Sequence, residues 1–162
     1  MMNMIKKLLS IILLCSVSSA AFSFAGFLYV EVKGEILARP CTINNGKAIT
    51  INFGDVYSKD IDGETYIQDI NYNVECKGAL NPTMKLGIIG SSALFNDELL
   101  KTSIDDLGVA FKVNKKHLAI KDKISFRYKK PPKLSAFLVK KNNADLPVRA
   151  FSASAILQVE YQ

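Results

Sequence analysis

Few side chains in this sequence could perform chemistry, and they lie far apart along the chain. His117 is the only histidine, and it follows two lysines in a polar stretch, where an exposed histidine is more common than a catalytic one. Serine and aspartate are present as partners, yet no Gly-x-Ser-x-Gly motif presents a nucleophile. Asp105 and Asp106 form a lone acidic pair without the further oxygen ligands that calcium requires. We therefore predict no enzyme, no metal site, no cofactor and no small-molecule substrate.

The start of the chain has the features of an export signal. A basic segment, Met1–Lys7, precedes the apolar run Leu8–Val17, which is shorter than the ~20 residues of a membrane-spanning helix. The Ser23-Phe24-Ala25 segment has small residues where the peptidase reads them, which predicts cleavage after Ala25; cleavage after Ala21 is the alternative. We therefore expect residues 1–25 to be a signal peptide.

The cysteines indicate a covalent crosslink. Cys15 lies inside the signal, and the bulky Leu14 before it disfavours a lipid-attachment motif. Removal of Cys15 leaves Cys41 and Cys76, and an even count in an exported chain indicates one disulfide. Their spacing lacks the paired ligands of a zinc site.

Charge and length narrow the choice of function further. The chain carries a net charge of +6, or +4 once Lys6 and Lys7 are set aside with the signal. The remaining lysines are scattered through expected turns, a pattern typical of a solvated surface, so we predict no nucleic-acid partner. The part that follows the signal has the length of one domain.

Apolar residues alternate with polar ones along most of this part, which predicts an all-β fold. At its beginning, Leu28, Val30, Val32, Gly34 and Ile36 share one face of an extended run. At its end, the residues that share one face are Phe151, Ala153, Ala155, Leu157, Val159 and Tyr161.

Between these two runs, turn residues separate further strands. We expect a long irregular connection over 90–106, with one helical turn at Asn96 to Leu100, and a loop at Lys129–Lys133, where prolines cannot donate to a ladder. About seven short strands predict an immunoglobulin-like sandwich. The expected strands are Cys41–Ile43, Ile49–Phe53, Ile70–Cys76, Thr83–Ile89, Gly108–Val113, Ile124–Tyr128, Leu134–Lys140 and Phe151–Tyr161.

Four ordered motifs resemble one protein family, the subunits of chaperone-usher pili (fimbriae), and most closely the minor or adaptor subunits of P-like pili. An extended run passes through a glycine into the first cysteine over Gly34–Gly46, and a Phe-Gly step follows in Phe53–Val56. Val74-Glu75-Cys76 carries the second cysteine, and Phe151–Gln162 resembles the family's last strand, with tyrosine next to last. Arg149 stands where the family usually has a glycine.

The resemblance implies an incomplete sandwich of six strands with one disulfide. The pilin domain would be 35–162, and the preceding segment 26–34 would be an N-terminal donor strand that completes a neighbouring subunit. Its inserted residues would be Leu28, Val30 and Val32, and Gly34 would pass a shallow part of the groove or form an ordinary bulge. The acceptor groove would lie along the C-terminal strand, at Phe151, Ala153, Ala155, Leu157, Val159 and Tyr161.

The resemblance also implies partners and a location. A periplasmic chaperone would lend a strand first, and the next subunit would replace that strand at the outer-membrane usher. The subunit would pass through the periplasm to a cell-surface pilus and contribute to adhesion there. Two alternatives remain open at this point: the N-terminal run is the first strand of its own domain, or the chain is a self-contained immunoglobulin-like binding module.

Overall fold

The structure is a computed structural model that describes residues 26, 28–35, 41–77 and 83–162. The chain divides into two units, residues 1–36 and residues 37–162, and each is described by itself. The predicted signal, residues 1–25, lies outside the described residues.

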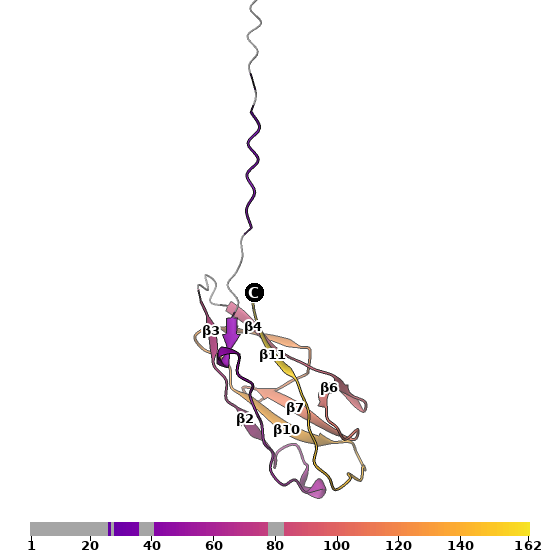
Figure 1. The fold of residues 1–162 in the computed structure, drawn as a ribbon. Helices are drawn as coiled ribbons and strands as arrows, with labels where there is room; N and C mark the ends of the chain where they lie inside the picture. Colours follow the sequence, from indigo (N-terminus) through magenta and orange to yellow (C-terminus); the bar gives the residue numbers. More distant parts are fainter. Residues whose placement is uncertain (1–25, 27, 36–40, 78–82) are drawn as a thin grey trace, which may run out of the picture. The chain divides into compact units, whose positions relative to one another are not determined.

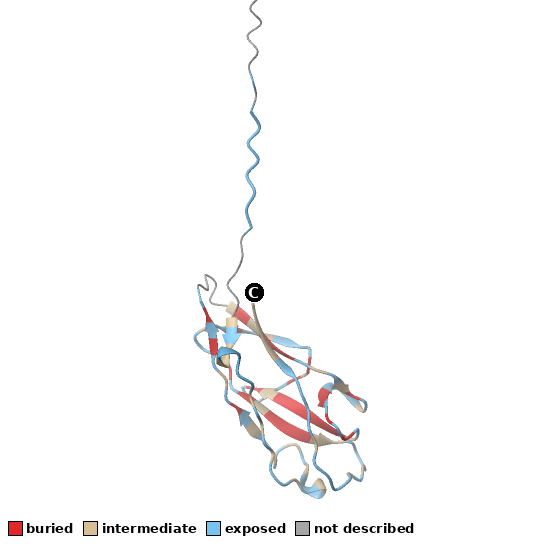
Figure 2. Cartoon of the chain, in the orientation of Figure 1, coloured by how far each residue is buried: buried red, intermediate tan, exposed pale blue. Residues whose placement is uncertain are grey.

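The described part of the first unit is an extended arm. Gly26 and residues 28–35 form no helix or strand, and all of their side chains are exposed (Figure 2). Leu28 and Val32 are each 88% exposed, and Val30 is 75% exposed. On the arm's other face, Lys33 Nζ lies 3.0 Å from Glu31 Oε1. The arm therefore carries a bare apolar face along one side of an extended backbone.

The second unit is built from short antiparallel strands (Figure 1). Two short 3-10 turns, Asn44–Gly46 and Ser58–Asp60, interrupt the strand order. The first turn fits its sequence, because Asn44, Asn45 and Gly46 all have positive φ angles, which asparagine and glycine tolerate best. The strands are β1 (Cys41–Ile43), β2 (Gln68–Ile70), β3 (Val74–Cys76), β4 (Thr83–Ile89), β5 (Ser92–Ala93), β6 (Asn96–Lys101), β7 (Leu107–Val113), β8 (Lys116–Leu118), β9 (Lys123–Arg127), β10 (Leu134–Lys140) and β11 (Ile156–Tyr161).

The strands form two main sheets and one small ribbon. The larger sheet has the order β2-β10-β7-β6-β5, with β8 also paired to β7. The smaller sheet has the order β11-β4-β9, so β11 pairs with β4 on one side only. The ribbon joins β1 to β3. The predicted strands Thr83–Ile89 and Leu134–Lys140 are confirmed at both ends.

Both sheets contribute side chains to one hydrophobic core. Alternate residues of β4, Met84, Leu86 and Ile88, are all buried, and they pack with Phe111 and Leu138 of the larger sheet. Alternate positions of a strand face the same side, so these buried residues follow the period-two pattern of the sequence. The shared core makes the domain a sandwich of two sheets.

The expected irregular connection over 90–106 is wrong in part, because it contains β5 and β6. The helical turn predicted at Asn96 to Leu100 is also wrong, since these residues belong to β6. The adjacent residues Leu99 and Leu100 are both buried, and they pack on opposite faces of the strand. Leu100 belongs to the main core, whereas Leu99 joins a smaller cluster with Phe137 on the other side of the sheet.

Other expected strands differ in their extent. The segment between the expected strands Gly108–Val113 and Ile124–Tyr128 contains β8, whose Leu118 is buried. The strand expected over Ile70–Cys76 is divided into β2 and β3. Two segments that were expected to be strands, Ile49–Phe53 and 151–155, have the alternating pattern of a strand. They pair with no strand in the described part of the chain.

The all-β, immunoglobulin-like prediction is therefore confirmed, with more and shorter strands than expected. No helix among the described residues is long and apolar enough to cross a bilayer. The two unpaired segments lie at the site described next.

Candidate functional site

The main feature of the domain is an apolar groove between two segments that are far apart in sequence. Its volume is about 680 Å³. Residues 46–53 form one wall, and residues 151–155 with Leu157 form the other. The floor consists of core side chains: Ile70, Ile88, Leu100, Val109 and Phe111.

The backbone of the first wall is unpaired. Ile49, Ile51 and Phe53 alternate toward the core, as in a strand. Yet no backbone N–H or C=O group of residues 48–53 makes a hydrogen bond within the described part of the chain. Backbone groups in a sandwich normally have partners, so this wall has the form of a strand that lacks its neighbour.

The second wall has the same property. In residues 151–155 only Ser152 is held: its N–H donates to Ser103 Oγ at 3.1 Å and its C=O accepts from Ser103 N–H at 2.9 Å. Beyond it, β11 pairs with β4 along one edge, with Leu157 opposite Ile88. The other edge of β11, from Ile156 to Glu160, pairs with no strand among the described residues.

Two aromatic rings stand at one end of the groove. The ring centroids of Phe53 and Phe151 are 6.2 Å apart and come from opposite walls. On the outer face of the smaller sheet, both Oε atoms of Glu160 lie 2.8 Å from Lys123 Nζ. This ion pair ties β11 to β9 across β4, so the second wall is braced from outside. The groove therefore has two walls that are in place before any strand enters it.

Four of the six residues predicted for the acceptor strand line the groove, and two do not. Phe151, Ala153, Ala155 and Leu157 line the groove, and the two alanines leave its wall shallow. Val159 and Tyr161 pack against the core further along β11 and do not line this cavity. The wall at residues 46–53 was not predicted as part of the site, although the alternation of Ile49, Ile51 and Phe53 marked it as a strand.

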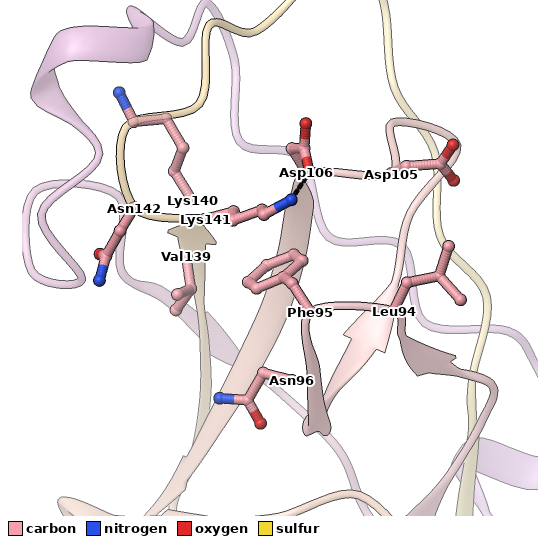
Figure 3. Close-up of a pocket in the computed structure, with 9 residues that line it drawn as sticks. All are labelled: Leu94, Phe95, Asn96, Asp105, Asp106, Val139, Lys140, Lys141 and Asn142. Carbon is pink, nitrogen blue, oxygen red and sulfur yellow. Dashed lines mark ion pairs between the residues drawn. The ribbon is translucent and has the colours of Figure 1, made fainter.

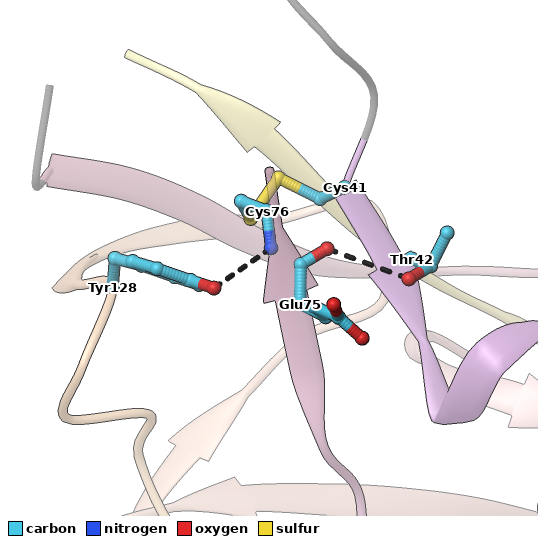
Figure 4. The surroundings of a disulfide bond; sticks show 5 residues. All are labelled: Cys41, Thr42, Glu75, Cys76 and Tyr128. Carbon is cyan, nitrogen blue, oxygen red and sulfur yellow. Dashed lines mark hydrogen bonds between the residues drawn. A yellow bond between two sulfur atoms is a disulfide. The ribbon is translucent and has the colours of Figure 1, made fainter. Parts of the chain in front are cut away.

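The disulfide joins Cys41 to Cys76, as the sequence predicted (Figure 4). It fastens β1 to β3, whose register places Cys41 opposite Cys76. Two further hydrogen bonds support this pair: Thr42 Oγ1 donates to the Glu75 C=O at 3.4 Å, and Cys76 N–H donates to the Tyr128 hydroxyl at 2.8 Å. Because β1 leads directly into the first wall, the disulfide anchors that wall at its beginning.

A second cavity, of about 600 Å³, lies on the outer side of the larger sheet (Figure 3). Phe95 and Val139 lie toward its centre, and Lys141 Nζ lies 3.3 Å from Asp106 Oδ1 at its rim. No group of three or more histidine, cysteine or acidic side chains within the described residues could hold a metal ion. His117 is partly exposed, and its Nδ1 lies 3.8 Å from Glu98 Oε2. None of these side chains is a nucleophile that lies beside a general base.

The family of this chain is assigned from its sequence. The sequence profile of the family "Fimbrial protein" matches residues 30–162. This chain belongs to the fimbrial protein family. It is thus a fimbrial subunit, a component of the cell-surface fimbria.

Individual relatives agree with this assignment. The fimbrial-like protein YfcQ of Escherichia coli K12 is 28% identical over 151 residues, which cover 89% of this chain and 93% of YfcQ. Among solved structures, the P pilus rod subunit PapA is 19% identical with a TM-score of 0.58, over 83% of this chain and 100% of PapA. A subunit of a chaperone-usher pilus is 21% identical with a TM-score of 0.56, over 85% of this chain and 97% of that subunit. At these identities the structural likenesses show a shared fold.

Proposed function

We propose that this fimbrial subunit polymerises by donor-strand exchange, in which a strand from a neighbouring subunit fills the groove. The observation that carries the proposal is the pair of unpaired backbone segments, 48–53 and 153–155, on either side of an apolar floor. An inserted strand would supply hydrogen-bond partners for both walls and cover the exposed core. The open groove counts against the alternative of a self-contained binding module.

The arm is the proposed donor. Its apolar residues Leu28, Val30 and Val32 are fully available, because each is at least 75% exposed. Burial of one such side chain contributes ~1.5 to 3 kcal/mol, so three contribute roughly 5 to 9 kcal/mol before ordering costs. Gly34, with no side chain, is proposed to pass the shallowest part of the acceptor groove.

The same groove would have to be covered by another protein during export. An unfilled groove with free backbone groups is a template for aggregation, so we propose that a periplasmic chaperone occupies it first. Exchange with the arm of the next subunit then takes place at the outer-membrane usher. Residues 1–25, as a signal peptide, would direct the chain into the periplasm.

Within the fibre we propose a minor position, at the tip or as an adaptor, that contributes to adhesion. The support is the sequence resemblance to adaptor subunits, together with an arm that can act as a donor. A terminating subunit would need no such arm. Immunogold labelling of the subunit along isolated fibres tests this: label confined to the tip is expected, and uniform label along the shaft would contradict it.

Deletion of residues 26–33 tests the exchange itself. The shortened subunit should still form a soluble complex with its chaperone, because its groove is intact. It should no longer enter the groove of a neighbour, so subunit ladders on non-reducing gels should be lost. A matched control replaces Glu31 and Lys33 by serine and should retain the ladders. Loss of chaperone binding on deletion of the arm would contradict the assigned roles.

A further inference from the structure

The two ends of the domain carry different charges. The β10 strand runs from Leu134, opposite Val113, to Lys140, opposite Leu107, and so spans the length of the larger sheet. We name the two ends of the domain along this strand the disulfide end, toward Leu134, and the carboxylate end, toward Lys140. The disulfide end comprises residues 41–43, 74–77, 113–116 and 127–134, and the carboxylate end comprises residues 54–66, 103–106 and 140–150.

Hydrogen bonds bring the segments of the disulfide end together. Tyr72 donates from its hydroxyl to the Pro132 C=O at 2.6 Å, and Cys76 N–H donates to the Tyr128 hydroxyl. Asn114 N–H donates to the Lys133 C=O at 2.9 Å, which adds the β7–β8 turn. The turn that contains Pro131 and Pro132 thus lies beside the disulfide.

This end is strongly basic. Its only carboxylate among the described residues is the Glu75 side chain. None of its basic side chains forms an ion pair within the described part of the chain, and all are exposed. These side chains are Lys77, Lys115, Lys116, Arg127, Lys129, Lys130 and Lys133.

Hydrogen bonds also join the loops of the carboxylate end. Lys141 N–H donates to the Asp106 C=O at 2.9 Å, and Lys140 Nζ donates to Ser58 Oγ at 3.5 Å. Ser103 pairs with Ser152, which fixes the beginning of the second groove wall at this end.

At this end, carboxylates outnumber basic groups. Two of the carboxylates are paired locally, Asp105 with Lys101 at 3.7 Å and Asp106 with Lys141 at 3.3 Å. Asp62 stays ionised, because hydrogen bonds from the backbone of Thr65, then from the backbone of Glu64, lower its pKa to about 2. The carboxylates are Asp55, Asp60, Asp62, Glu64, Asp105, Asp106 and Asp145, against Lys59, Lys140, Lys141 and Arg149.

Covalent connection limits which ends can meet. This step rests on the proposed donor-strand exchange. An arm that lies antiparallel to β11 places its Glu35 beside residues 151–155, at the carboxylate end of the acceptor. The six steps from Glu35 to Cys41 span at most about 22 Å. The disulfide end of the donor subunit must then lie within about 22 Å of the groove wall at the carboxylate end of the acceptor.

A parallel arm would give the opposite result. Its Glu35 would lie near Tyr161, and the two basic disulfide ends would face each other. Like charges across an interface are unfavourable, whereas opposite charges accelerate and orient association. The charge distribution therefore favours the antiparallel arrangement.

We propose that the basic disulfide end of one subunit docks on the carboxylate end of a second copy of this chain, as a contact separate from the exchanged strand. The arm and groove hold the subunits together, and the charged ends set the orientation and the rate of approach. Two complementary ends on one chain fit successive copies arranged head to tail.

Charge reversal tests the docking in full-length chains. We expect Lys129→Glu with Lys130→Glu to slow fibre formation about tenfold at low salt, the lower range for electrostatic steering. Asp60→Lys with Glu64→Lys should slow fibre formation to a similar extent. The difference should largely disappear at 0.5 M NaCl, where the screening length is only a few ångströms. A control that reverses a lysine outside both ends, Lys121→Glu, should assemble near the wild-type rate.

The decisive variant carries both reversals in one chain. Each junction then has its charges exchanged, so the wild-type rate should return, which a folding defect could not produce. An unchanged rate in the single-end variants at low salt, or no recovery in the combined variant, would overturn the docking. A labelled peptide of residues 26–35 should bind all variants equally, which shows that their grooves are intact. If that peptide fails to bind even the wild-type chain, the proposed exchange itself is wrong.

Discussion

The alternation of the arm leads to a sharp prediction for Val30. Its side chain is 75% exposed in the arm, and donor-strand insertion would bury it on the groove floor. Val30→Ala removes two carbon atoms at ~0.8 kcal/mol each, or about 1.6 kcal/mol in total. Since about 1.4 kcal/mol corresponds to a tenfold change, the substitution should weaken binding of the arm about 15-fold.

Fluorescence anisotropy of a labelled peptide of residues 26–35 measures this effect. The acceptor is the full-length chain with aspartate at positions 28, 30 and 32, whose own arm cannot enter a groove. Glu31→Ala in the peptide is the matched control, because Glu31 lies on the opposite face and is paired only with an exposed lysine. It should change the affinity less than threefold. Equal losses for the Val30 and Glu31 peptides, or no loss for Val30→Ala, would refute the reasoning.

Three further variants test the stability of the domain. Cys41→Ser with Cys76→Ser opens a loop of 35 residues and should lower the free energy of unfolding by about 4 kcal/mol in the chain-entropy account, measured by urea denaturation. Burial raises the pKa of Tyr72 to about 12, so the folded state keeps its proton where the unfolded state loses it. Stability should therefore fall as the pH rises from 10 to 12, and Tyr72→Phe should lack this part of the fall. Gly90→Ala would place a methyl group against Leu100 on the groove floor, and calorimetry should show a loss of about 1 to 3 kcal/mol, whereas a neutral result would contradict the close packing.

The sequence predicted those strands whose burial is decided by local alternation. Met84, Leu86 and Ile88 illustrate this, since one face of β4 is buried and the pattern shows which. Leu99 and Leu100 illustrate the limit. A strand buried on both faces carries adjacent apolar residues, and its sequence resembles a short helix.

Only one wall of the groove, the C-terminal segment, was predicted from the sequence, and the reason is similar. The pattern at Ile49, Ile51 and Phe53 shows which side chains face the core, but not which backbone lies beside them. Strand pairing depends on residues distant in sequence, here the segment 151–155 across the groove. The first wall, residues 46–53, could therefore be assigned to the site only when the fold placed the two segments together.

The central claim is that the domain lacks a strand that a neighbour supplies. Hydrogen exchange of the backbone amides of residues 48–53 and 153–155, measured by mass spectrometry, tests it most directly. In the unassembled chain these amides should exchange rapidly while those of β10 remain protected, and in assembled fibres both sets should exchange slowly. Protection of residues 48–53 before assembly, or continued rapid exchange in the fibre, would contradict the account.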